Sequence, residues 1–520
     1  MLDTINTINS AVNNFIWGIP ALFLLIGTGI LTSCLTKFFQ VSHFGHWWKV
    51  TVGGIFKRNS HAKRNSDQKA ISQFQALCTA LAATVGTGNI AGVATAIATG
   101  GPGSVFWMWV AAFFGMMTNY SENVLGIFYR RKNESNEWCG GAMYYLRDGL
   151  GSKKGCKHLG AILAVCFSVF AILASFGIGN LAQANTISTN IAETISSVMK
   201  GINPDFTPPV INIGGLEING FMLAVGILLV ITAALVIVGG IKRIASVTEK
   251  LVPFMVVIYI AGTLVILFAN ITKIGEVFSS IFQFAFGFKA VAGATVGVAV
   301  KQAVTMGFKR GVFSNEAGLG SSVMVHSASN VKEPVMQGMW GIFEVFADTI
   351  VVCTLTAFAI LSSGLIDLST GEMLTDAITT ALVTQAFSSV FGYAGGIFVA
   401  LAILLFAFST ILGWSYYGTK AWEYLFGTKA TMIYKIVFVL VIIVSASLPE
   451  AYVDLPWNLS DTFNGLMMLP NLIGVIALSG TVLAITKNYV SRNIKNQSGI
   501  KPMLSAFEDI QKAHEEAITK

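Results

Sequence analysis

Apolar residues along this chain gather into stretches of helix length that short polar segments separate. A bilayer core of about 30 Å needs roughly 20 helical residues per crossing. Eleven stretches meet this requirement, near residues 14–36, 72–99, 102–129, 159–195, 219–240, 249–270, 275–307, 336–363, 391–418, 430–448 and 459–486. The fourth and seventh are too long for one crossing and are expected to continue beyond the bilayer. The pattern predicts an all-α integral membrane protein with eleven transmembrane helices.

The second stretch is interrupted at its middle by Val85-Gly86-Thr87-Gly88-Asn89. Glycine costs about 1 kcal/mol in a helix interior, so this run predicts an unwound segment at membrane depth. Inside lipid, unwound backbone is tolerated only where it lines a cavity or is buried against protein. Such a break offers a binding site for a small zwitterion and a cation, and it favours a transporter. The alternative is a glycine pair that serves close helix packing.

A second interruption is expected at 282–289, followed by Gly293 and Gly297. Four uninterrupted stretches lie between the two, so five-helix repeats beginning with a broken helix are predicted. Because five is odd, the repeats are inverted, and sites are expected between them near the midplane. The chain then divides into 1–71 (extracellular N-terminus, extra helix and basic loop), repeats at 72–270 and 271–490, and a cytoplasmic tail at 491–520.

Composition and charge agree with a membrane protein. The chain is 54% hydrophobic and 11% charged, too little polar surface for a soluble globule of 520 residues. The net charge of +7 would suit nucleic acid, but the basic residues lie in alternate loops rather than in one domain. The positive-inside rule then places the N-terminus outside and the C-terminus in the cytoplasm. The loops assigned to the cytoplasm include Lys57, Arg58, Arg130, Arg131, Lys309 and Arg310.

Cysteines and histidines argue against several classes of protein. The six cysteines have neither disulfide nor metal-site spacing. Histidines, His326 among them, fall only in loops or at cytoplasmic span ends, which weakens a haem protein, an intramembrane metalloprotease or a histidine proton relay. The start of the chain has no basic segment, so the first span is predicted to be retained. No cofactor is expected.

Polar groups near the first break are the candidate substrate ligands. Free amides at a half-helix N-terminus attract a carboxylate, which selects Gly86, Thr87 and Gly88. In the fourth span, polar recognition and interhelical hydrogen bonding are about equally expected for Gln183 and Asn185. The aromatic candidates for the sides of a small pocket are Phe284, Phe286, Phe288 and Trp414, although aromatic residues are common in membrane proteins.

Oxygen ligands for a hard monovalent cation are also available. The hydroxyls of Ser409 and Thr410 are adjacent in the ninth span, and they could join the carbonyls of Ala82 and Val85. Asn89, the last residue of the run 86–89, is a further candidate sodium ligand. A Ser-Thr pair in a membrane helix, however, more often bonds a carbonyl one turn back in its own helix.

Three acids lie within the predicted spans, at Glu122, Glu344 and Asp348. An ionised acid at membrane depth costs about 2.5 to 3.5 kcal/mol and is usually functional, so these are candidates for coupling or gating. A buried acid satisfied by amides or water is the alternative. Two connecting segments are also marked: 311–321, on the cytoplasmic side, as an inner gate or a tight connection, and 375–392 as a helical lid or a surface helix.

Several stretches together resemble the alanine or glycine:cation symporter family, the sodium:alanine carriers: VGTGNIAGVATAI, GGAMYYL, GNLAQAN, KRGVFSNEAGLGS, DTIVVCT and FAFSTILGWSYYG. The likeness runs from about residue 73 to the eleventh span, with Ala142 where the family often has proline. It implies a leucine-transporter-like fold of five plus five inverted helices after one extra helix.

The resemblance also implies roles for particular residues. Thr87 and Gly88 resemble positions that hold the substrate carboxylate, Gln183 a polar contact, and Trp414 a limit on side-chain size. The carbonyls of Ala82 and Val85 with the hydroxyls of Ser409 and Thr410 resemble the sodium site of this fold.

The sequence therefore predicts a sodium-coupled symporter of the cell membrane that imports alanine or glycine by alternating access. Its expected partners are the amino acid, sodium and the lipid bilayer, with no nucleic acid. A proton-coupled carrier of the same fold that uses Glu122, Glu344 or Asp348 remains an alternative. A membrane-embedded enzyme is opposed by the lack of a metal cluster or catalytic triad, and a channel by the lack of acidic rings.

Overall fold

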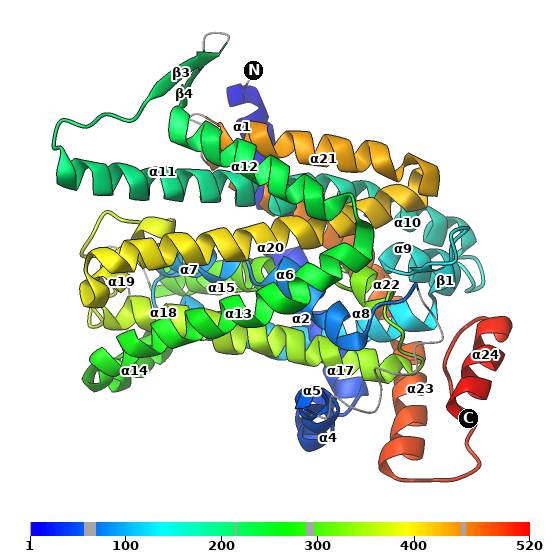
Figure 1. Ribbon diagram of the computed structural model, residues 1–520. Helices are drawn as coiled ribbons and strands as arrows, with labels where there is room; N and C mark the ends of the chain where they lie inside the picture. Colours follow the sequence, from blue (N-terminus) through cyan, green and yellow to red (C-terminus); the bar gives the residue numbers. More distant parts are fainter. Residues whose placement is uncertain (1, 57–68, 214–215, 288–295, 449–453, 520) are drawn as a thin grey trace.

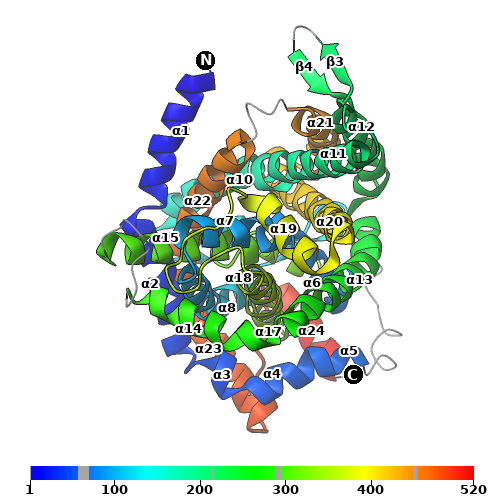
Figure 2. The ribbon, with the colours of Figure 1, turned by 90° about the vertical axis from the view of Figure 1, so that its left-hand side faces the viewer.

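The computed structural model describes residues 2–56, 69–213, 216–287, 296–448 and 454–519. Long helices α11, α20 and α13 run roughly side by side (Figure 1), and Figure 2 shows the assembly from one end. The first half contains α1 Leu2–Ile16, α2 Ile19–Leu35, α3 Phe39–Ser42, α4 Phe44–Val50, α5 Val52–Phe56, α6 Gln73–Thr84, η1 Thr87–Asn89, α7 Ala91–Gly100, α8 Ser104–Phe128, α9 Ala142–Tyr144, η2 Tyr145–Leu150, α10 Lys157–Phe176, η3 Gly177–Leu181, α11 Ala182–Ile202, α12 Gly220–Ile237 and α13 Gly240–Ala269.

The second half is also helical and ends in a docked tail. It contains η4 Ile271–Lys273, α14 Ile274–Ala285, α15 Val296–Asn315, α16 Val323–His326, α17 Pro334–Val345, η5 Phe346–Cys353, α18 Thr354–Ser362, α19 Thr379–Phe391, α20 Tyr393–Phe426, η6 Thr428–Ala430, α21 Thr431–Ala446, α22 Asp454–Ala477, α23 Ser479–Tyr489, η8 Val490–Ile494 and α24 Glu508–Thr519.

Strands are confined to two small antiparallel hairpins in the described part of the chain. One pairs β1 Arg131–Lys132 with β2 Trp138–Cys139, in the register Arg131 opposite Cys139. The other pairs β3 Val210–Ile213 with β4 Leu216–Asn219 and projects from the helices near α11 and α12 (Figure 1). The fold that carries the site is therefore helical.

Seven helices of the described residues are long and apolar enough to cross a membrane, or up to nine when each bent pair counts as one span. Most expected stretches coincide with these helices within a few residues. The fourth stretch, expected to be too long for one crossing, is a continuous 46-residue run, Lys157–Ile202. It passes through a π-helical segment, η3, of the kind that often marks functional sites.

The predicted break in the second stretch is present. Ser72 and Gln75 form a capping box that starts α6, with each side chain 3.0 Å from the other residue's backbone nitrogen. The helix ends at Thr84, η1 follows, and α7 leaves at 58° to α6. Because α6 through α7 is almost wholly buried, the unwound backbone is packed against protein, as a break at membrane depth requires.

The structure describes part of the second expected break, and it also shows a break between helices at 316–322, called the second break below. Of the predicted segment 282–289, α14 covers the start and ends at Ala285, while residues 288–295 lie outside the described residues. Helix α15 instead runs on to Asn315, and the chain is irregular at 316–322 before α16. This stretch is buried throughout, with Gly318 against Leu25 and Leu472, so it packs inside the protein rather than forming an exposed loop. Two glycines with positive φ, Gly318 and Gly320, allow the tight path.

Lys309 and Arg310, which charge counting places in a cytoplasmic loop, lie within α15. Lys309 Nζ is 3.1 Å from Asn13 of α1, and both cations pair with Asp461 of α22. Charge counting assigns the segments that carry Asn13 and Asp461 to the outer side. The two cations bind a buried acid, and charge counting assigns these paired residues to opposite sides of the membrane.

Other connecting segments follow the sequence more closely. The segment 375–392 contains a helix, α19, whose Phe387 is buried against Phe391 and Phe398. The tail packs on the rest of the protein: Arg492 forms an ion pair with Glu333, and Ala506 N donates to Phe128 O. All six cysteines are free.

Candidate functional site

The break at 86–89 is held by its own side chains and by a neighbouring helix. Asn89 Oδ1 accepts from Gly86 N at 2.9 Å, which closes the unwound turn. Gln183, directly after η3, places its Oε1 3.4 Å from Thr87 N, and its Nε2 donates to Ile178 O. The Thr87 hydroxyl is buried and has no hydrogen-bond partner among the described residues. A buried hydroxyl without a partner is costly, so this atom is suited to bind a ligand.

The glycines of the break have a packing role. A Cβ at Gly86 would lie 2.3 Å from Thr410 Oγ1, and one at Gly88 would lie 3.1 Å from Ser314 Cα. The packing alternative therefore applies, because the absent side chains let α20 and α15 approach the unwound backbone.

Ser409 and Thr410 lie against the end of α6. Each hydroxyl is 3.1 Å from the carbonyl oxygen of Ala82, and each also bonds Phe406 O within α20. The bond to the same helix is the ordinary one, whereas the bond to Ala82 joins α20 to α6. Val85 ends α6 one turn later and is buried. Hydroxyl and carbonyl oxygens that converge in this way are the type of ligand that binds a sodium ion. Asn89 lies four residues after Val85.

Asn89 connects the break to one of the predicted acids. Its Nδ2 donates to Asp348 Oδ1 at 2.7 Å, and Ser314 Oγ and Thr349 Oγ1 each lie 2.8 Å from Asp348 Oδ2. Asp348 is on η5 and is fully buried. Three donors around one carboxyl group satisfy its oxygens inside the protein. The sequence suggested both Asn89 and Asp348, but not that they bind one another.

Glu344, one turn before Asp348, is paired with a histidine. His326 Nε2 is 3.0 Å from Glu344 Oε2, both side chains are fully buried, and Gln337 Nε2 is 2.5 Å from His326 Nδ1. The sequence places His326 at a cytoplasmic span end, and the lack of a histidine in the middle of a span argues against a histidine proton relay. That argument fails, because tertiary packing encloses His326 beside an acid of the α17 span.

Glu122 lies apart from this pair. Its Oε1 accepts from Asn471 Nδ2 at 2.5 Å, and the same amide donates to Gly318 O in the second break. Glu122 therefore helps to join α8, α22 and the irregular segment 316–322. This arrangement matches the structural alternative for a buried acid.

Trp414, on α20, is buried where this helix meets η3 and the segment 316–322. Its Nε1 donates to Glu316 Oε1 at 2.7 Å, and its ring is edge-on to Tyr417 with centroids 5.3 Å apart. A Cβ at Gly179 of η3 would lie 2.2 Å from Trp414 Cβ. The indole therefore packs directly on the segment that leads into Gln183.

Other predicted substrate residues are not brought to the break. Asn185 Nδ2 bonds Ser445 O of α21, which is the interhelical alternative. Phe284 packs against Gly103 and Gly371, and Phe286 is 49% exposed and contacts Phe106. Phe288 lies outside the described residues.

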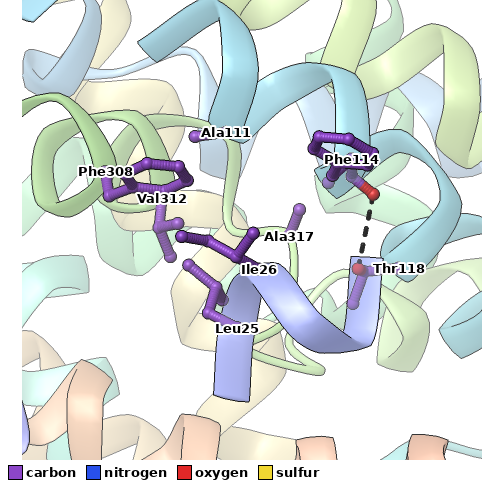
Figure 3. A pocket seen from close by; sticks show the side chains of 9 residues that line it. Leu25, Ile26, Ala111, Phe114, Thr118, Phe308, Val312 and Ala317 are labelled. Atoms are coloured by element: carbon purple, nitrogen blue, oxygen red, sulfur yellow. Dashed lines mark hydrogen bonds between the residues drawn. The ribbon is translucent and has the colours of Figure 1, made fainter. Parts of the chain in front are cut away.

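An apolar pocket between α2, α8 and α15 does not suit a zwitterion (Figure 3). Leu25 and Ile26 face Phe114, Phe308 and Val312 across it. Its hydroxyl, on Thr118, is 3.5 Å from Phe114 O of the same helix. The lining thus offers no group for an ammonium or a carboxylate.

Sequence reasoning missed Glu316, His326, Ser314, Asn471 and Asp461 as site residues. The FSNEAGLGS motif contains Ser314 and Glu316, so the motif carried a signal that periodicity did not reveal. No comparable local signal points to Asn471 or Asp461, because their partners lie far away in the chain.

Comparisons with known proteins were made for the whole chain. A family model described as the sodium:alanine symporter family matches residues 2–503. The "Sodium/alanine symporter AgcS" of Methanococcus maripaludis is 44% identical over 94% of this chain and 98% of its own. The "Probable sodium/glutamine symporter GlnT" of Bacillus subtilis is 34% identical over 99% and 96%. The crystal structure of MhsT in complex with L-phenylalanine aligns with a TM-score of 0.51 at 14% identity, over 81% of this chain and 98% of that one.

Proposed function

The chain belongs to the sodium:alanine symporter family and is a cation-coupled amino-acid symporter rather than an enzyme, and we propose that it imports alanine or glycine together with sodium. The observation that carries this proposal is the contact between the break at 86–89 and α20. Polar groups for a zwitterion and oxygens for a cation lie side by side there, joined by Ala82 O and Thr410 Oγ1 at 3.1 Å.

Each group has a proposed task. Thr87 and Gly88 bind the substrate carboxylate, and Gln183 is a further polar contact. The carbonyls of Ala82 and Val85 bind sodium with the hydroxyls of Ser409 and Thr410. Trp414 limits the size of the substrate side chain. This assignment is supported by the burial of all these residues and by the unpartnered Thr87 hydroxyl.

One sodium ion is sufficient to drive accumulation. A charge moved through 100 mV releases about 2.3 kcal/mol, and a tenfold sodium gradient adds about 1.4 kcal/mol. Together these correspond to roughly 500-fold accumulation of a neutral amino acid. The proposed mechanism is alternating access between the two sides of the membrane.

We further propose eleven crossings, with α8 (25 residues) and α15 (20 residues) added to the nine helical candidates. Inverted five-helix repeats are supported by the two breaks, at 86–89 and 316–322, with four spans between them. The MhsT-like fold is consistent with this arrangement. The proposed orientation in the cell membrane has the N-terminus outside and the C-terminus in the cytoplasm. It rests on the positive-inside rule, applied to the basic loop residues other than Lys309 and Arg310.

Uptake of radiolabelled alanine into proteoliposomes tests the function. Vesicles with an inward sodium gradient are compared with matched vesicles that have potassium or choline outside and a proton gradient. Accumulation that requires sodium and that excess glycine competes away is the expected result. Equal uptake without sodium would contradict sodium coupling.

A proton-coupled carrier is the second candidate, and the buried pair of His326 and Glu344 favours it. Histidine and carboxylate side chains inside membrane spans form the proton relays of pumps and transporters. Uptake that follows the proton gradient and ignores sodium would support this candidate over the first.

A further inference from the structure

Glu316 and Trp414 form a buried hydrogen bond between the second break and α20. Glu316 Oε1 lies 2.7 Å from Trp414 Nε1, and Glu316 Oε2 accepts from Ser321 Oγ at 2.5 Å. Glu316 is 1% exposed and Trp414 is fully buried. The indole nitrogen is a donor only, so the carboxylate satisfies its single hydrogen-bonding group. The bond holds the nitrogen edge of the indole against Glu316.

The backbone at Glu316 is unusual in a way that directs this side chain. Glu316 follows the last residue of α15 and has φ 56°, a left-handed conformation that few residues other than glycine adopt. Such conformations persist only where the surroundings enforce them, and they cluster at functional sites. Here the conformation ends α15 and places the carboxylate against α20 rather than along α15.

Two further contacts of Trp414 are made by its apolar atoms. Gly179 gives room at Trp414 Cβ, and Tyr417 meets the ring edge-on. Gly179 belongs to η3, and Gln183 follows on the next turn and reaches Thr87. A tilt of the indole would therefore change the space beside the segment that contacts the break.

We infer that Glu316 is a positioning residue that fixes the indole of Trp414 and thereby sets the size limit for the substrate side chain. This inference rests on the proposed function, in which Trp414 bounds the pocket for a small neutral amino acid. Glu316 itself is assigned no contact with the substrate. Its position in the break also links selectivity to the docking of 316–322 against α20.

A double-mutant cycle tests the inference in proteoliposomes of the full chain. Sodium-dependent uptake of alanine and of leucine is measured as kcat/KM for wild type, Glu316→Ala, Glu316→Gln, Trp414→Phe and Glu316→Ala with Trp414→Phe. Glu316→Ala is expected to lower the alanine-to-leucine ratio about tenfold, the scale of discrimination by side-chain size. Glu316→Gln keeps an acceptor oxygen and is expected to restore most of the ratio. Trp414→Phe already lacks the donor, so adding Glu316→Ala should not lower its ratio further.

Ser321→Ala is the matched control. It removes the other bond of the same carboxylate and leaves the indole bond in place, so the ratio should stay near that of wild type. Additive losses in the double variant, or equal falls for alanine and leucine in Glu316→Ala, would overturn the inference. If Glu316→Ala does not fold, Trp414→Phe still breaks the bond without changing residue 316, and unchanged exclusion of leucine there would overturn it. Absence of sodium-dependent alanine uptake in wild type would instead contradict the proposed function.

Discussion

Asn89 donates a hydrogen bond of 2.7 Å to the buried carboxylate of Asp348, so the unwound segment of one broken helix is fixed to an acid on η5. The two residues are 259 positions apart. The same carboxylate accepts from Ser314 at the end of α15, so three segments meet at one charge. A buried carboxyl group beside a proposed sodium site should favour cation binding, because its ionised form attracts a positive charge.

Asp348→Asn removes this charge while keeping the shape of the side chain. We expect the sodium concentration for half-maximal alanine uptake to rise about tenfold, which corresponds to about 1.4 kcal/mol. Thr349→Val is the control, because it removes one hydroxyl donor to Asp348 without changing the charge. An unchanged sodium dependence with a lower maximal rate would assign Asp348 a structural role instead.

Thr410→Ala removes one of the proposed sodium ligands. The sodium concentration needed for uptake should rise, because an oxygen that reaches Ala82 is lost. Sodium titration of alanine uptake measures this. Ser415→Ala is a suitable control, since Ser415 is buried on the same helix but bonds only Leu412 O one turn back among the contacts described. Equal sodium dependence in the two variants would contradict the assignment of Thr410 as a sodium ligand.

Trp414→Ala should admit amino acids with larger side chains. Removal of the indole opens space beside η3, so leucine and phenylalanine should become substrates or competitors of alanine uptake. Trp422→Ala, two turns further along α20, contacts Phe426 and Tyr434 instead and should retain the exclusion. Continued exclusion of both large amino acids by Trp414→Ala would count against this residue as a boundary of the pocket.

Asp461→Asn should destabilise the protein strongly. Its side chain is 1% exposed and pairs with Lys309 at 2.8 Å and Arg310 at 3.2 Å. Breaking a buried ion pair leaves uncompensated charge and costs about 3 to 5 kcal/mol. Thermal unfolding in detergent measures the loss. Lys501→Ala is the control, because Lys501 is 75% exposed and its pair with Glu515 should contribute at most about 1 kcal/mol. Equal shifts in the two variants would refute this account.

Docking of the C-terminal helix α24 should weaken in acid. Burial, with Arg130, Lys332 and Lys132 nearby, lowers the pKa of His514 from 6.5 to about 4. Between these values the released helix binds a proton that the docked helix does not, so docking is fully stable above pH 6.5 and is progressively lost as the pH falls toward 4. Hydrogen exchange of residues 508–519 at several pH values measures this. His514→Gln should remove the pH dependence, and a wild type without it would contradict the prediction.

Much of the fold could be predicted from local signals. Stretches of about 20 apolar residues must be helices in a bilayer, because their backbone groups have no other partners there. The first break was readable because Gly86 and Gly88 are poor helix formers within three positions of one another. The break at 316–322 was not, because its charged and hydroxyl residues have the composition of an exposed loop. It is buried because residues from α2, α8, α20 and α22 enclose it.

The candidate site divides in the same way. The sequence by itself determined the helical membrane architecture, the family and the groups Gly86, Thr87, Ser409 and Thr410, since each is marked by its neighbours in the chain. Only the tertiary structure decided that Asn185 bonds α21, that His326 is buried against Glu344, and that Glu316 binds Trp414 across 98 positions. Periodicity reports which face of a helix is apolar, but the partner of a buried polar group is chosen by which helices pack together, and that choice is made over the whole chain.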